Sequence, residues 1–116
     1  MQDVLFQANY YRDPYKTKTG AYLKHSQLAA WNNEAAVDPE VKANFAKTEQ
    51  FVCVKALGDT MIFPNEGEHW GTFADNSYTT ILKMADTDYY KRDLFGLQTA
   101  DKAGKIHFEE TKGNHL

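Results

Sequence analysis

Two segments that lie far apart in the sequence, residues 51–57 and 105–111, constrain the fold of this chain more than any other feature. The first is short, contains β-branched valines and is apolar almost throughout, which is typical of a strand covered on both faces in a parallel sheet. The second begins with alternating apolar and polar residues, a pattern that also indicates a strand. Because helical patterns precede and separate the two strands, the sequence predicts an α/β fold.

The predicted helices begin at residues that favour helix N-termini, because their side chains can accept a hydrogen bond from the first helical turn. Pro at the first helical position and Gly after the last one strengthen such assignments. Helices are predicted at 26–33 after Ser26, from Asp38 and Pro39 to about Lys47, and from Thr87 through Leu94 with Gly96 as the terminator.

Two strands cannot build a parallel sheet that is covered on both faces. We therefore expect residues 1–116 to form one partial α/β domain, whose other strands belong to a missing N-terminal half of the same domain. Alone, the chain would expose strand edges and apolar surface, so a second expectation is that the isolated chain is unfolded or aggregated.

Composition and charge argue against two classes of partner. The net charge is -3 and no cluster of Lys and Arg is present, so we expect no nucleic-acid partner. The longest apolar run is far shorter than the roughly 20 residues that cross a bilayer, so we expect no transmembrane segment. Residues 1–4 lack the features of a signal peptide, which indicates either a cytosolic protein or a targeting segment further upstream.

Asp59 and His115 are the candidate catalytic residues, because each stands in a glycine-containing loop directly after a predicted strand. Acid before histidine is the chain order of the last two members of a hydrolase triad, in which the acid orients the imidazole and stabilises its protonated form. Alternatively, Asp59 only closes a turn and His115 is an ordinary loop residue. No Gly-x-Ser-x-Gly segment that could supply the nucleophile is present.

Other chemistry finds less support in the sequence. His69 with Glu66 and Glu68 does not match the helical spacing of a zinc-ligand pair, and Cys53 has no second thiolate to join it, so we expect no metal site. Cys53 lies in a predicted buried strand, where a thiol is usually inert. The segments 61–63 and 68–71 are rich in apolar side chains. Two alternatives follow: these side chains line a cleft beside Asp59, or they pack in the core.

Seven segments, in register over nearly the whole chain, resemble the C-terminal part of the lysosomal palmitoyl-protein thioesterases. They are 10–14 (YYRDP), 24–26 (KHS) leading to 32–34 (NNE), 51–55 (FVCVK), 59–62 (DTMI), 68–71 (EHWG), 94–97 (LFGL) and 113–116 (GNHL). The resemblance implies an α/β-hydrolase fold, no cofactor, a lysosomal location and removal of long-chain fatty acyl groups from S-acylated cysteines in proteins and peptides.

By this resemblance, Asp59 is the triad acid, His115 is the general base that protonates the leaving thiolate, and Met61 and Ile62 border the fatty-acyl groove. The serine nucleophile and the oxyanion hole would lie upstream of residue 1. One departure is that no Asn-x-Ser/Thr glycosylation site occurs, although relatives often carry them. The alternative function is a non-catalytic remnant that binds fatty acyl groups without hydrolysing them.

Overall fold

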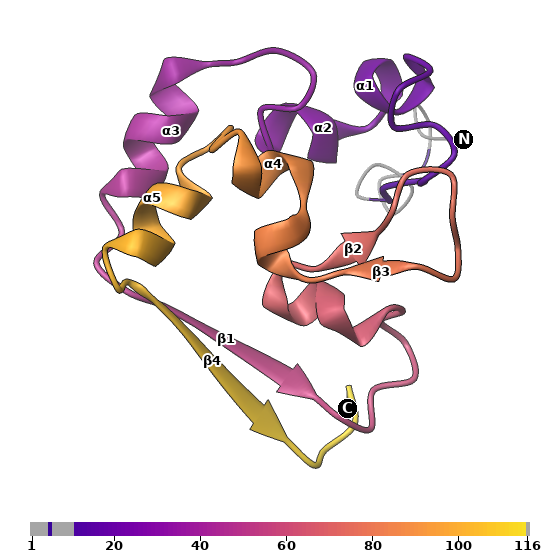
Figure 1. Ribbon diagram of the computed structural model, residues 1–116, viewed down its shortest axis with the longest axis vertical. Helices are drawn as coiled ribbons and strands as arrows, with labels where there is room; N and C mark the ends of the chain where they lie inside the picture. The colour runs from indigo at the N-terminus through magenta and orange to yellow at the C-terminus, as the bar shows by residue number, and fades with distance from the viewer. Residues whose placement is uncertain (1–4, 6–10, 116) are drawn as a thin grey trace.

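A parallel pair of strands forms one margin of the protein. The computed structural model describes residue 5 and residues 11–115. Strand β1 (Phe51–Ala56) pairs in parallel with β4 (Ile106–Thr111), in a register that runs from Phe51 opposite Ile106 to Ala56 opposite Thr111 (Figure 1). The predicted mixed α/β architecture with a parallel sheet is confirmed, and the carboxyl ends of both strands meet at the same edge.

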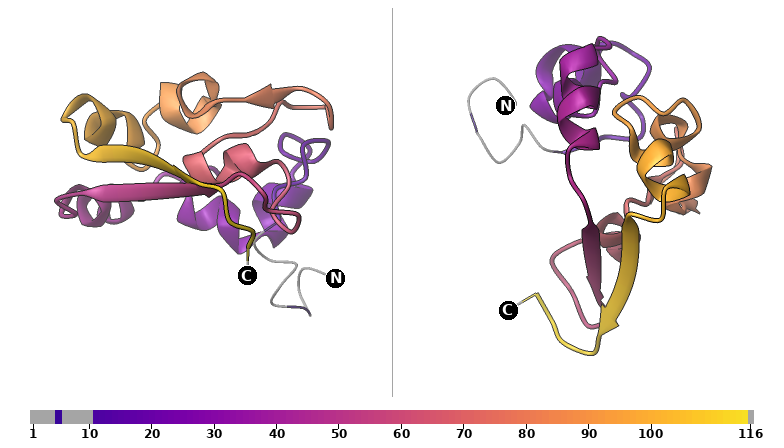
Figure 2. Two further views of the ribbon diagram at one scale, coloured as in Figure 1. Left: turned by 90° about the horizontal axis from the view of Figure 1, so that it is seen from below. Right: turned by 90° about the vertical axis from the view of Figure 1, so that its left-hand side faces the viewer.

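Short helices and a small hairpin make up the rest of the described chain (Figures 1 and 2). The α-helices are α1 (Ala21–His25), α2 (Gln27–Trp31), α3 (Pro39–Ala46), α4 (Asp88–Lys91) and α5 (Leu97–Lys102). Two 3₁₀ turns, η2 (Asn65–His69) and η3 (Met84–Asp86), flank the antiparallel pair of β2 (Thr72–Phe73) and β3 (Ile81–Leu82). Within the described residues, no helix has the length and apolar character needed to cross a membrane.

The predicted N-caps of α3 and α4 are confirmed. The Asp38 carboxylate accepts the Glu40 N–H at 2.9 Å, with Pro39 at the first helical position. The Thr87 hydroxyl accepts the Tyr90 N–H at 3.3 Å. Both side chains satisfy an amide that the first turn of a helix leaves without an intrahelical partner.

The predicted role of Gly96 is wrong. Helix α4 ends at Lys91, and Gly96, with φ +98°, is the N-cap of α5. The chain turns earlier because Asp93 adopts a left-handed conformation with φ +49°. From there the Asp93 carboxylate accepts the Thr99 N–H at 3.1 Å and the Thr99 hydroxyl at 2.5 Å, which fixes the start of the next helix.

The core lies on one face of the β1–β4 pair. Buried side chains of η3, α4, α5 and the start of β4 form it, and Phe45 of α3 stacks on Phe51 at a ring distance of 4.5 Å. The opposite face differs from the sequence expectation, because Val52 and Val54 are exposed, Val52 by 61%. Cys53 faces the core with Phe51 and is half-buried rather than buried. Among the described residues, nothing covers Val52 and Val54, whereas Ala56 at the end of the strand is buried.

Candidate active site

Backbone hydrogen bonds extend the parallel ladder beyond the ends of both strands. Leu57 donates its N–H to the carbonyl oxygen of Thr111 at 2.8 Å, and Gly58 donates to that of Gly113 at 3.0 Å. The loops that follow β1 and β4 are therefore joined before the two candidate residues. Asp59 is the residue directly after this junction on one loop, and His115 lies two residues after it on the other.

The Asp59 carboxylate is fixed on both of its oxygens. Its Oδ1 accepts the backbone N–H groups of Met61 at 2.6 Å and Ile62 at 3.0 Å, which close a tight turn after β1. Its Oδ2 lies 2.8 Å from Nδ1 of His115. The structure thus brings together the two predicted catalytic residues, which are 56 positions apart in the sequence.

The environment of Asp59 favours its charged form. Its side chain has no exposed surface, and burial alone would raise the pKa of the carboxyl group. Hydrogen bonds from the Ile62 amide, His115 and the Met61 amide, together with a contact to Glu68, outweigh burial and hold the pKa well below its ordinary value. Asp59 is therefore ionised at neutral pH.

An ionised Asp59 fixes the tautomer of His115. Nδ1 carries the proton and donates it to Asp59, so Nε2 keeps its lone pair and can accept a proton. The His115 side chain is 38% exposed, while its acid partner is buried beneath it. This arrangement can act as a general base towards a hydroxyl group that approaches Nε2.

Asn114 ties the two loops together, a contact that sequence analysis did not single out. Its Oδ1 accepts the His115 backbone N–H at 2.7 Å and the Thr60 N–H at 3.4 Å. One side chain therefore links the backbone of the acid loop to that of the histidine loop. The only signal in the sequence is its place directly before His115.

Glu68 is a third titratable residue of the site. Asp59, Glu68 and His115 each offer one nitrogen or oxygen atom, and these atoms lie within 4.8 Å of one another. Within the described part of the chain, this is the one group that could hold a metal ion. Both oxygens of Asp59 are already used by two amides and by His115, so orientation of the imidazole accounts for the cluster.

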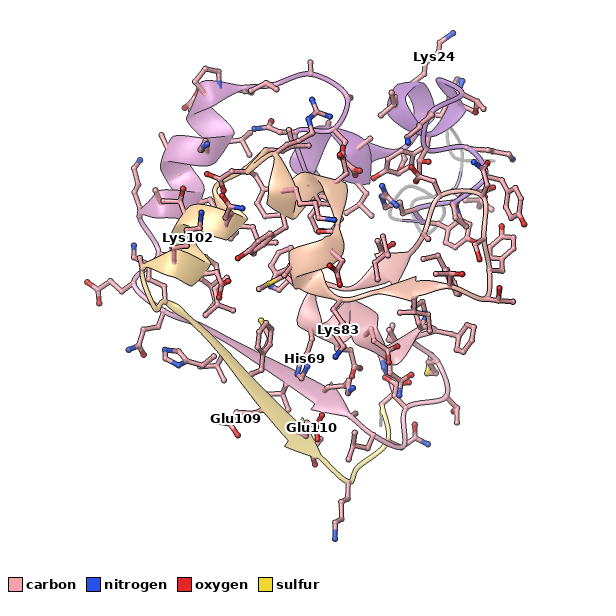
Figure 3. All side chains as sticks on the ribbon, viewed as in Figure 1. Lys24, His69, Lys83, Lys102, Glu109 and Glu110 are labelled. Atoms are coloured by element: carbon pink, nitrogen blue, oxygen red, sulfur yellow. The ribbon has the colours of Figure 1, made fainter. Side chains whose placement is uncertain are left out.

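The other groups weighed as metal ligands lie outside this cluster. Glu66 is not part of it, and His69 faces β4, where its Nε2 lies 2.9 Å from the carbonyl oxygen of Glu109 (Figure 3). The His69 ring also packs against Phe108, at a ring distance of 4.7 Å. Cys53, on β1, is not part of the cluster formed by Asp59, Glu68 and His115.

A mostly apolar cavity of about 320 Å³ lies beside the acid loop. Ile62 lines it together with Phe63, Trp70, Phe73 and Tyr89. The wall is fixed by the Tyr89 hydroxyl, which donates to the carbonyl oxygen of Trp70 at 2.6 Å. Met61 is not among the lining residues and is 65% exposed at the tip of the acid turn.

Comparison with known proteins identifies the family of the chain. The sequence model of the family described as palmitoyl protein thioesterase matches residues 1–115. Palmitoyl-protein thioesterase 1 of Caenorhabditis elegans is 37% identical over 117 residues, which cover 100% of this chain and 39% of that protein, in its C-terminal part. Palmitoyl-protein thioesterase 3 of Dictyostelium discoideum is 31% identical, covering 99% of this chain and 40% of that protein.

A further relative is lysosomal thioesterase PPT2-B of Xenopus laevis, which is 30% identical over 90% of this chain and 36% of its own length. The chain thus spans about two fifths of the length of these curated relatives. Since the family match extends over nearly every residue, from the first helices to the loop of His115, the chain belongs to the palmitoyl protein thioesterase family.

Proposed function

We propose that the protein containing this chain is a serine thioesterase that removes long-chain fatty acyl groups from S-acylated cysteines in proteins and peptides. In this proposal the chain supplies the acid, Asp59, and the base, His115. The observation that carries it is the 2.8 Å contact between Asp59 and Nδ1 of His115 at the carboxyl ends of two parallel strands. The family membership supplies the substrate class.

The chemistry would proceed in two halves. His115 Nε2 takes the proton of a serine hydroxyl as its oxygen attacks the thioester carbonyl. The tetrahedral intermediate then collapses to an acyl-serine, and the protonated imidazole gives its proton to the departing cysteine thiolate. In the second half, His115 takes a proton from water as the water oxygen attacks the acyl-serine, and the protonated imidazole then gives that proton to the serine oxygen as the fatty acid leaves. Asp59 stays ionised throughout.

The nucleophile and the oxyanion hole would come from a part of the protein that precedes this chain. Residues 1–116 would then form the C-terminal portion of one α/β-hydrolase domain. The exposure of Val52 and Val54 on one face of β1 supports this proposal, because a covering layer from the rest of the domain would bury these side chains. The whole would act in the lysosome, since some relatives are named lysosomal thioesterases.

The acyl chain would bind along the acid loop. Ile62 lines the 320 Å³ cavity, and its N–H is held by the catalytic acid, so the end of the acyl chain next to the thioester would lie near His115. Met61, on the same turn, would border the entrance of the groove. Pockets of this apolar character are suited to alkyl ligands that need few polar contacts.

The test is to express the complete coding sequence that contains these residues and to assay it on an S-palmitoylated peptide. We expect fatty acid and free peptide thiol to be released in equal amounts. A coding sequence that begins at Met1, or a longer protein that binds palmitate and leaves the thioester intact, would contradict the proposal. The second result would favour the acyl-binding remnant.

A further inference from the structure

Glu68 connects the end of β1 to the catalytic pair. It lies on η2, the 3₁₀ turn that packs against β1 between that strand and the β2–β3 hairpin (Figure 1). The carboxylate Oε2 accepts the backbone N–H of Ala56 at 2.6 Å, and the Asn65 side-chain amide donates to the carbonyl oxygen of Ala56 at 3.1 Å. Two side chains of one turn thus satisfy both polar groups of one backbone residue.

These bonds take the place of a neighbouring strand. Phe51 and Leu57 donate towards β4, so the alternate residue Ala56 presents its N–H and carbonyl on the opposite edge of β1. Ala56 is the last residue of the strand and is buried. On the edge of β1 that faces away from β4, Glu68 and Asn65 therefore bind the polar groups of Ala56 that a further strand would use. The Asp59 N–H also donates to the Ala56 carbonyl oxygen, at 3.1 Å, so the acid turn begins at the residue that these two side chains hold.

The same Glu68 carboxyl group also lies close to Asp59 and His115. Its oxygen, one Asp59 oxygen and one His115 nitrogen lie within 4.8 Å of one another. A residue that only capped the strand would not need to stand beside both members of the pair.

We propose that Glu68 is a positioning residue for the Asp59–His115 pair, holding the acid turn against the end of β1 and placing a second carboxyl group beside the imidazole. This inference rests on the proposed function. Glu68 would not touch the reacting atoms of the substrate, and it would act through Asp59 and His115.

The elements packed against the pair carry further charged groups. Lys55 of β1 pairs across the ladder with Glu110 at 3.7 Å, and His69 of η2 contacts the Glu109 carbonyl. Among the described residues, none of these joins the group formed by Asp59, Glu68 and His115. The titratable and charged side chains on β1, η2, β4 and the loop after β4 are Lys55, Glu66, His69, Glu109, Glu110 and Lys112.

The test compares Glu68→Gln with Glu66→Gln in the complete enzyme. Glutamine at position 68 keeps an oxygen that can accept the Ala56 N–H but removes the charge. Glu66 is on the same turn and outside the cluster, so its variant is a matched control. We expect Glu68→Gln to lower kcat by about ten- to a hundredfold, the scale of a small misplacement of a catalytic group, with KM within about twofold.

Two further readouts separate positioning from mere folding. A carboxylate beside an imidazole favours its protonated form, so its removal should move the acid limb of the kcat/KM profile to lower pH. For the same reason, the His115 ring resonances in NMR should titrate at lower pH in Glu68→Gln than in Glu66→Gln. The NMR titration requires no substrate, so it tests Glu68 even if the enzyme hydrolyses no thioester and the proposed function fails.

Two outcomes would overturn the inference. One is a Glu68→Gln enzyme with the kcat, pH profile and His115 titration of Glu66→Gln. The other is a variant with a lower melting temperature and lower kcat whose pH profile and His115 titration are unchanged, because that result assigns Glu68 to the fold alone.

Discussion

Gly58 donates its backbone N–H to the carbonyl oxygen of Gly113 at 3.0 Å, and this bond joins the acid loop to the histidine loop. The two backbones approach so closely that a Cβ built on Gly58 would lie 2.9 Å from that same oxygen and 3.5 Å from the Lys112 carbonyl oxygen. Position 58 therefore requires glycine because no space is left for a Cβ. The backbone conformation does not require it, because the φ of Gly58 lies outside the left-handed region.

Gly58→Ala should separate the two loops and weaken both folding and catalysis. The clash is with backbone, which cannot turn aside as a side chain can, and overpacking of this kind costs about 1–3 kcal/mol in the free energy of unfolding. Thermal melts and kcat on an S-palmitoylated peptide measure the two effects. Gly113→Ala is the matched control, because among the described residues a Cβ there meets the Thr111 side chain alone, at 3.6 Å. Equal behaviour of the two variants would contradict the argument.

Asp59→Asn should abolish most of the activity and leave the fold intact. Asparagine keeps an oxygen for the Met61 and Ile62 amides, but its NH₂ group would face His115 Nδ1 and stabilise the wrong tautomer. The same change in a triad lowers kcat on the order of ten-thousandfold. Asp38→Asn is the control, since asparagine caps a helix as well as aspartate does. Loss of less than tenfold in kcat would rule out Asp59 as the acid.

Acid should destabilise the protein through Asp93. Burial alone would raise its pKa, but the Thr99 hydroxyl, Lys42 and the Thr99 amide lower it from the ordinary value of 3.8. Its contribution to stability is complete above that value and is lost as pH falls through the lower pKa of the folded state. Melting temperatures between pH 6 and pH 2 should therefore fall less steeply in Asp93→Asn than in the unmodified protein.

Asparagine tolerates the left-handed conformation at position 93, so this variant should fold. Asp86→Asn is the control, because that side chain is exposed on η3. If Asp93→Asn and Asp86→Asn lose stability with acid to the same extent, the contacts of Asp93 do not contribute. Asp59 and Asp75, whose pKa values are also lowered, contribute in the same direction and remain in both variants.

Local sequence patterns predicted the two strands and the starts of α3 and α4. The strand at 51–57 is apolar almost throughout, and Asp38 and Thr87 cap their helices within three residues, so neighbouring residues alone carry these signals. Gly96 was misassigned because a glycine with positive φ suits either end of a helix, and the choice depends on Asp93 three residues earlier. The pairing of Asp59 with His115 needed the added knowledge that parallel strands end at the same edge.

Glu68 and Asn65 were not predicted to cap β1, because their partner is set by the tertiary fold. They contact Ala56 from twelve and nine residues away through a 3₁₀ turn whose sequence, NEGEH, has no helical periodicity. The exposure of Val52 and Val54 likewise could not follow from the strand pattern. The strand pattern shows which side chains are apolar enough to be buried, but another part of the protein must pack against them to bury them.

Ile62→Asn should reduce the preference for long acyl chains. Ile62 lines the apolar cavity and is 38% exposed, so a polar side chain there would add a group that an alkyl chain cannot satisfy. We expect kcat/KM for a palmitoyl thioester to fall about tenfold or more, and that for a butyryl thioester to change little, because a short chain does not reach the cavity. Ile81→Asn is the matched control, since Ile81 is equally exposed, at 38%, and lies on β3 outside the cavity lining. A ratio of palmitoyl to butyryl activity that falls equally in both variants would place the acyl chain elsewhere, because the change would then follow from lost apolar surface in general.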